Sequence, residues 1–253
     1  MKLIELENYL IDLYDINEFN DYCPKGLTVE GKPEVLKGIT AVSFGLDLLD
    51  YAIEHKVDFI VVHHLHGFWN NQSKIVRGTL KKKIQGLLDN DISLFGFHLP
   101  MDAHLKIGNN AGVLSALNAH QVGGFLKEGN KNIGLLGKLE NPMTPESLLS
   151  LLSDKVGPPN FEFMYGPSLI KKIGVCTGAA PSGVEELVAL GDIDAYITGE
   201  ARENTQQYCM EEGIHFIAAG HHQTECFGPQ LLAQHLTNKL NLEVNFINIH
   251  NPV

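Results

Sequence analysis

Two adjacent histidines, His63 and His64, end an apolar run that begins at Phe59. Apolar residues rich in valine predict a buried strand, and open α/β sheets place their ligands at the carboxyl ends of strands. Because neighbouring side chains on an extended strand point to opposite sides, the pair could serve two neighbouring metal ions rather than chelate one. The residues alone leave a second interpretation open, that these are ordinary edge or loop histidines.

Two further stretches place metal-binding side-chain types directly after an expected strand. His98 and Asp102 follow one, and His221 and Glu225 follow another. Imidazole and carboxylate together suit Zn, Mn, Fe or Co better than Ca or Cu(I). The four-residue spacing of His221 and Glu225 is also typical of a surface pair on a helix, and Asp102 could instead cap a helix. It is the coincidence at three strand ends that favours a metal site.

Expected strands and helices alternate along the chain, and these elements must position the candidate residues. This alternation predicts sheets covered by helices. We expect helices over residues 3–13, 46–55, 75–90, 109–120, 144–155, 183–190, 204–212 and 229–239, with Thr144 as an N-cap. We expect strands over residues 39–44, 58–62, 93–98, 172–176, 195–198, 215–219 and 244–249. The two halves share this rhythm and predict two similar lobes. The Gly-, Lys- and Asn-rich stretch 121–132 is the expected boundary, so the first lobe covers 1–125, completed by 226–253, and the second covers 126–225.

Composition narrows the class of protein. The chain has 253 residues, four widely spaced cysteines and a net charge of −11. No apolar run approaches a membrane span, and the acidic start of the chain argues against a secretory signal. Cysteines without a CxxC motif favour free thiols in the cytoplasm over disulfides or a sulfur-ligated zinc site.

Nucleic acid is an improbable partner for so acidic a chain. The one basic run covers residues 81–83, with Lys74 and Arg77 nearby, and is typical of the solvated face of a helix. The small-residue turn 177–182 favours a structural role over an anion site at a helix start. No GxSxG motif is present, and Cys226 would need an activating base to act as a nucleophile.

Several motifs occur in a specific order over nearly the whole chain. They are residues 62–64 with Phe68 and Trp69, then 98–104 (HLPMDAH), 197–200 (ITGE), 220–225 (GHHQTE), the opening 27–31 and the closing Asn251-Pro252. In these motifs the chain resembles the NIF3 family, also named GTP cyclohydrolase 1 type 2 homologues, in the compact bacterial form without an inserted domain. One departure is that Leu65 and His66 precede Gly67, which makes this loop one residue longer than usual.

The resemblance implies a fold and a site. The fold is α/β, with two similar three-layer α/β/α lobes and a metal site between them, and the assembly is a toroidal homohexamer. The site implied is a dinuclear centre of two divalent ions (Zn, Mn, Fe or Co) held by His63, His64, Asp102, His221 and Glu225, with Glu225 as the bridge.

Three functions follow as hypotheses. The first is a metal-dependent hydrolase of a nucleotide-like or phosphorylated small molecule, in which His98 or His66 orients groups or transfers protons. The second is a non-catalytic metal-binding ring protein for storage, delivery or scaffolding. The third, nucleic-acid binding through a ring, is the weakest because the chain is acidic.

Overall fold

The computed structural model describes residues 1–70, 72 and 75–253, which form two compact units. The first unit comprises Met1–Met101 and Gly228–Ile249, and the second comprises Asp102–Phe227 and His250–Val253. Each has its own sheet, its own buried core and helices against the sheet. The expected α/β fold with two lobes is confirmed.

The first unit is built on a five-stranded sheet in the order β1-β4-β3-β2-β11. Its strands are β1 (Gly26–Val29), β2 (Lys37–Ser43), β3 (Phe59–His64), β4 (Ser93–Gly96) and β11 (Glu243–Phe246). All neighbours are parallel except β1 and β4. Its helices are α1 (Leu3–Tyr14), the 3-10 turn Ile16–Glu18, α2 (Leu46–Glu54), α3 (Gly78–Asp89) and most of α10 (Phe227–Leu240).

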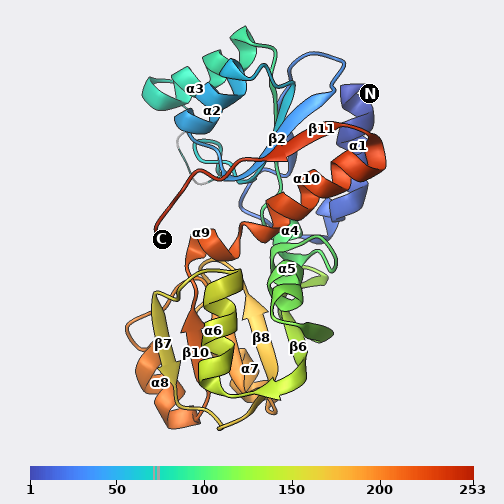
Figure 1. The fold of residues 1–253 in the computed structure, drawn as a ribbon. Coiled ribbons are helices and arrows are strands. Elements are labelled where there is room, and N and C mark those ends of the chain that lie inside the picture. Colours follow the sequence, from blue (N-terminus) through green and yellow to red (C-terminus); the bar gives the residue numbers. More distant parts are fainter. Residues whose placement is uncertain (71, 73–74) are drawn as a thin grey trace. The chain divides into compact units, whose positions relative to one another are not determined.

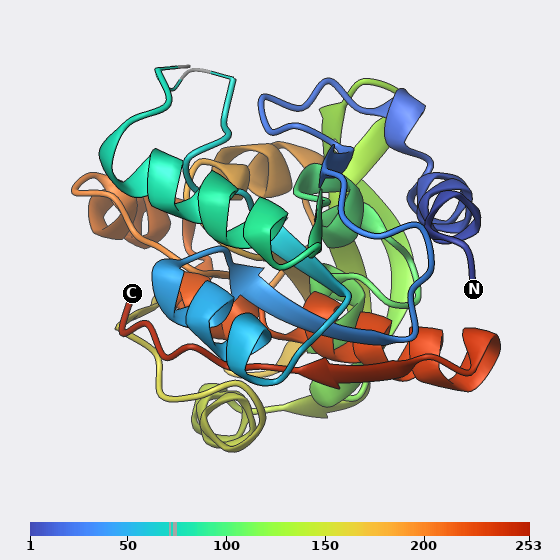
Figure 2. The same cartoon turned by 90° about the horizontal axis from the view of Figure 1, so that it is seen from above.

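Helices cover both faces of this sheet. In Figure 1, α2 and α3 lie on one face while α1 and α10 lie on the other, and Figure 2 shows α2 and α3 side by side. The apolar spacing of α1, which buries Leu3, Leu6 and Leu10, gives one apolar stripe toward the core. Every residue of β3 is buried, as expected for a central parallel strand covered on both faces.

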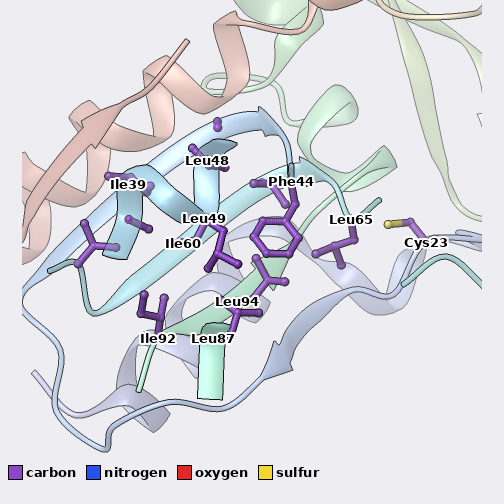
Figure 3. Close-up of a cluster of buried hydrophobic side chains, with 14 residues drawn as sticks. Cys23, Ile39, Phe44, Leu48, Leu49, Ile60, Leu65, Leu87, Ile92 and Leu94 are labelled. Carbon is purple, nitrogen blue, oxygen red and sulfur yellow. The ribbon is translucent and has the colours of Figure 1, made fainter. Parts of the chain in front are cut away.

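The core beneath α2 and α3 fixes the strands that carry the histidines. Side chains of α2, α3 and the sheet, among them Leu48, Leu87, Ile60 and Leu94, converge in one cluster (Figure 3). Leu65, directly after the histidine pair, belongs to the same cluster. The chain is therefore anchored by packing immediately beyond His64.

The second unit has a six-stranded sheet in the order β5-β6-β8-β9-β10-β7. Its strands are β5 (Ala119–Glu128), β6 (Lys131–Met143), β7 (Phe161–Met164), β8 (Ile170–Cys176), β9 (Ala195–Thr198) and β10 (His215–Ala218). Its helices are α5 (Asn109–Ala116), α6 (Pro145–Lys155), α7 (Gly183–Leu190), α8 (Thr205–Glu212) and α9 (His221–Thr224), and α4 (Leu99–Ala103) spans the division between the units. Residues of α5 and α6 share a buried cluster with the sheet.

The two units repeat one pattern. In the first, β2-α2-β3-α3-β4 forms parallel strands, and in the second β8-α7-β9-α8-β10 does the same. Asp58 precedes β3 and accepts backbone N–H groups of residues 36–37 at 2.7 and 2.9 Å. Asp194 precedes β9 and accepts those of residues 171–172 at the same two distances. The similarity expected from the sequence rhythm therefore extends to individual hydrogen bonds.

Residues 121–132 differ from their expected role. They lie in a long antiparallel hairpin of β5 and β6, whose turn contains Gly129 at a φ of 60°. The Gly, Lys and Asn content belongs to this half-exposed ribbon and its turn rather than to a linker. The boundary expected near residue 125 falls inside β5, whereas the units as defined by contacts divide after Met101 and after Phe227.

Most expected elements agree within a few residues, and α7 and β9 have the expected bounds. Thr144 caps α6 by accepting the Ser147 N–H at 3.3 Å, as expected. The helix expected from residue 75 begins at Gly78. Lys74 of the basic run lies outside the described residues. Within the described part of the chain, no helix is long and apolar enough to cross a membrane.

Candidate metal centre

The first unit brings three histidines together at the carboxyl end of its sheet. His63 and His64 end β3, and His98 follows β4, the neighbouring strand. One ring nitrogen from each lies within 4.8 Å of the others. Three imidazoles at this separation match the three-histidine sets that bind zinc. His98, expected as a proton-transfer residue, is thus also a candidate ligand.

The rings of the histidine pair converge rather than diverge. Their centroids lie 4.5 Å apart with 40° between the planes. The expectation that His63 and His64 bind two different ions therefore remains a proposal.

Hydrogen bonds fix the orientation of both rings. Nδ1 of His63 lies 3.1 Å from the Phe97 carbonyl oxygen, and since a carbonyl only accepts, Nδ1 carries the proton. Nδ1 of His64 lies 3.1 Å from Oγ of Ser43 on the adjacent strand β2. Nε2 is then the nitrogen of each ring suited to a metal, the arrangement found where metal-binding histidines are held by a hydrogen bond from behind.

His98 is held by the carboxylate of Asp21, which no motif in the sequence indicates. Oδ1 of Asp21 lies 3.0 Å from Nδ1 of His98, and Oδ2 accepts the Leu99 N–H at 2.9 Å. Burial alone would raise the pKa of Asp21, but the hydrogen bond and charge of His98, with two backbone donors, outweigh it and lower that pKa. An ionised Asp21 therefore fixes the ring of His98 through Nδ1.

His66, in the longer loop, is exposed and stacks on Trp69 with 5.7 Å between centroids and 14° between planes. Its backbone carbonyl accepts a hydrogen bond from Lys83 Nζ at 2.8 Å, and the same amine donates to the Phe44 carbonyl at 2.7 Å. Lys83 is buried, so the basic run 81–83 does not form one solvated face as expected. Its first two residues are exposed, and the third holds the loop that carries His66.

In the second unit, Asp102 is fixed by hydrogen bonds rather than acting as a helix cap. Its Oδ1 accepts Asn109 Nδ2 at 2.8 Å and Thr177 Oγ1 at 3.0 Å. Asn110 reinforces this connection, since its Nδ2 donates to the Asp102 carbonyl and its Oδ1 accepts the Thr177 N–H. The carboxylate is thus tied to α5 and to the end of β8.

His221 lies between two carboxylates of the same unit. Nδ1 is 2.6 Å from Oε1 of Glu200, and Nε2 is 3.2 Å from Oε2 of Glu225. Burial alone would lower the pKa of His221, but the hydrogen bonds and charges of Glu225 and Glu200 outweigh it and raise the pKa to about 9. A cation that binds at Nε2 must therefore displace a proton at neutral pH.

Glu225 lies close to Asp102, with carboxylate oxygens within 4.8 Å of one another. Both charges, after burial as the largest cause, raise the pKa of the Cys176 thiol well above its ordinary value. Two close carboxylates, one of them 3.2 Å from Nε2 of His221, are donors that suit a divalent cation, because a cation relieves the repulsion between the carboxylates.

The turn expected at residues 177–182 supports this cluster. Gly178 has a φ of 70°, and its N–H donates to Thr224 Oγ1 at 3.1 Å. A Cβ at this position would overlap Glu225 Oε1 and lie 3.3 Å from Nε2 of His221. The turn is therefore structural in the way expected, and its glycine makes room for the two donors.

Each unit thus assembles its own share of the expected residues: His63, His64 and His98 in one, and Asp102, His221 and Glu225 in the other. Sequence reasoning missed Asp21, Ser43, Thr177 and the positioning role of Glu200. Glu200 had a signal, since it ends the ITGE motif. Asp21 had none, because its partner lies 77 residues away in the chain.

Comparison with known proteins identifies the family of this chain. The sequence profile of the Duf34/NIF3 (NGG1p interacting factor 3) family matches residues 1–252. The chain belongs to the Duf34/NIF3 family. Relatives named GTP cyclohydrolase 1 type 2 homolog, from Haemophilus influenzae and Escherichia coli K12, are 40% and 37% identical over the full length of both chains.

Solved structures of this family share the fold. A protein called ybgI, described as of unknown function, is 36% identical with a TM-score of 0.93 over all of both chains. A crystal structure of a protein from Thermus thermophilus is 29% identical with a TM-score of 0.86 over 100% of this chain and 99% of that one. The NIF3 resemblance expected from the ordered motifs is confirmed.

Proposed function

We propose that this member of the Duf34/NIF3 family is a metal-dependent hydrolase with two divalent ions, held by His63 and His64 together with Asp102, His221 and Glu225. In this proposal Glu225 would be the residue that holds both ions. Zn, Mn, Fe and Co are the candidate metals, because the donors are imidazoles and carboxylates. The substrate is a nucleotide-like or phosphorylated small molecule.

One observation supports the proposal most directly: the structure positions the candidate ligands from behind in both units. His63 donates from Nδ1 to a carbonyl, and Nδ1 of His221 is held by Glu200. Nε2 of each ring is therefore the nitrogen that would hold a metal, and such supporting hydrogen bonds are typical of metal sites. The donor sets of the described residues therefore fit divalent cations.

Bound ions would supply Lewis acidity, lowering the pKa of water and stabilising negative charge that develops on the substrate. The protein's own contribution is positioning and proton transfer. His98, held through Nδ1 by the ionised Asp21, has Nε2 for accepting a proton from the attacking water and returning it to the leaving group.

The second candidate function is a non-catalytic metal-binding protein for storage, delivery or scaffolding. The same donor sets serve it equally well, so metal content does not separate the two functions. Turnover does. Nucleic-acid binding is disfavoured further, because Lys83 of the one basic run is buried against two carbonyls.

The test begins with the metal content of purified protein by inductively coupled plasma mass spectrometry. Protein loaded with Mn, Zn, Fe or Co is then screened against nucleotides, phosphoesters and cyclic amides. We expect Glu225→Gln and Asp102→Asn to lower any turnover by roughly 100-fold or more, while the exposed control Glu212→Gln keeps it. Metal without turnover would favour the non-catalytic function, and absence of metal would contradict both.

Two further expectations accompany the proposal. The ring-shaped homohexamer implied by the resemblance predicts about six times the chain mass of 27.9 kDa in light scattering. A cytoplasmic location agrees with four free cysteines, since disulfides persist mainly in oxidising compartments.

A further inference from the structure

The closing Asn251-Pro252 motif has no part in the proposed metal centre, yet the segment that contains it contacts the helix that carries a candidate ligand. This segment, His250–Val253, belongs to the second unit and is called the tail below. The Val253 carbonyl oxygen accepts the His222 N–H at 2.8 Å. Since His222 directly follows the candidate ligand His221 on α9, the tail contacts the backbone next to that ligand.

The local sequence restricts the shape of the tail. Oδ1 of Asn251 accepts the Val253 N–H at 3.1 Å, which forms the turn in which an asparagine side chain bonds the backbone two residues further on. Pro252 lies between them, and its ring fixes its own φ near −65° (about ±15°) and disfavours helical backbone at Asn251. The turn therefore determines the direction of the Val253 carbonyl.

The start of α9 needs a hydrogen-bond acceptor from elsewhere in the chain. Its N-cap is Gly220, which has no side chain that could accept an N–H of the first turn. The first N–H groups of a helix have no partner within the helix. His222 is buried, and a buried N–H without an acceptor is costly. The Val253 carbonyl therefore does for α9 what a capping side chain does for other helices.

The end of β9 holds the same turn of α9 from another direction. The Gly220 N–H donates to the Gly199 carbonyl at 3.1 Å. A Cβ at Gly199 would lie only 2.6 Å from Cα and 2.9 Å from N of His221, so glycine is required for this close approach. Backbone contacts from Gly199 and from Val253 thus fix the two successive residues His221 and His222.

We propose that the tail is a positioning segment for the metal ligand His221. The inference rests on the proposed function, since it assigns the tail a role at the same metal site. By accepting the His222 N–H, the tail keeps the backbone of His221 where Nδ1 of the ring meets Glu200. Without the tail, α9 leaves this arrangement for part of the time. Metal affinity then falls in proportion to the fraction of molecules that retain the arrangement.

The first test compares zinc affinities of purified variants, measured by competition with a chromophoric chelator. We expect deletion of residues 251–253 and Asn251→Ala to weaken zinc binding by roughly 2- to 30-fold, the equilibrium factor that corresponds to loss of a helix cap. Asn251→Asp keeps an acceptor oxygen and should restore the affinity. Val253→Ala keeps the carbonyl, and Asn238→Ala changes an exposed asparagine of α10, so both should bind zinc as the wild type does.

Hydrogen–deuterium exchange of the metal-free proteins gives a readout that does not depend on zinc. The amides of residues 220–225 should exchange faster in the deletion variant and in Asn251→Ala than in the wild type. Asn251→Asp and Val253→Ala should exchange at the wild-type rate. Where circular dichroism shows that the deletion variant does not fold, the three point variants of the tail decide the outcome.

Wild type that binds zinc, together with tail variants that bind it equally tightly, overturns this inference and leaves the metal centre in place. Exchange of residues 220–225 that is the same in all variants also overturns it. Wild type that binds no zinc contradicts the proposed function, and with it the role assigned to the tail.

Discussion

Substitution of Gly178 by alanine tests whether metal affinity depends on the position of the Glu225 carboxylate. A Cβ at Gly178 would overlap Glu225 Oε1, so the carboxylate must retreat by roughly 1 Å to restore a normal contact distance. Ligand distances in metal sites vary by only about 0.2 Å. We therefore expect Gly178→Ala to weaken metal binding by roughly 100-fold or more, since even loss of a supporting hydrogen bond costs about 10- to 100-fold.

Gly213→Ala is the matched control. Gly213 has a φ of 67°, close to the 70° of Gly178, but the nearest atom to its Cβ would be a carbonyl oxygen at 3.9 Å. Both variants should lose roughly 1–2 kcal/mol of stability from alanine in left-handed backbone, which lowers Tm by roughly 2–8 °C. Only Gly178→Ala should lose metal affinity.

The assay is competition for zinc against a chromophoric chelator, with thermal unfolding of the metal-free proteins followed by circular dichroism. Equal zinc affinity in Gly178→Ala, Gly213→Ala and the wild type would refute the reasoning, because it would mean that displacing Glu225 leaves the site intact. Loss of affinity in both variants would show that strain, and not the overlap, is responsible.

Three further predictions follow from single contacts. Glu200→Gln should weaken zinc binding by roughly 10- to 100-fold through its hydrogen bond to His221, measured by the same competition; unchanged affinity would remove Glu200 from the site. Burial alone would raise the pKa of Asp58, but Lys32 and backbone donors outweigh burial and lower that pKa. The ionised carboxylate therefore stabilises the fold at pH values above the pKa that Asp58 has in the unfolded chain. This contribution is lost as acid protonates the carboxylate. The difference in free energy of unfolding between wild type and Asp58→Asn, measured in urea, should therefore be full at pH 7 and shrink below about pH 4. A difference that stays constant with pH would contradict this role of Asp58. Lys83→Met should cost about 1.5–3 kcal/mol in urea unfolding, because it leaves two carbonyls without their charged donor, whereas the exposed control Lys82→Met should change stability by less than about 0.5 kcal/mol.

Much of the fold follows from local patterns in the sequence. The continuous apolar run before His63 predicts a central strand, and β3 is buried throughout. The same reasoning fails for β5 and β6. Residues 120–122 of this exposed ribbon show no alternation of apolar and polar residues, and its glycines are of the kind expected in a linker. Pairing between neighbouring strands, not local pattern, decides such a segment.

The candidate site is likewise predictable from the sequence only in part. Histidines and carboxylates at strand ends are visible because their residue types are distinctive, and His63, His64 and His98 come together in one unit. The groups that orient them are ordinary residues such as Ser43 and Asp21, and only the fold identifies their partners. The positions that support a ligand are therefore harder to predict than the ligand itself.

The most direct test of the central claim is a crystal structure of metal-loaded protein with anomalous diffraction recorded at the absorption edge of the metal. The proposal predicts two anomalous peaks per chain, within about 2.0–2.2 Å of Nε2 of His63 and His221 or of the carboxylate oxygens of Asp102 and Glu225. Protein soaked in zinc that shows no peak at these residues, or peaks only at other side chains, would contradict the proposed metal centre.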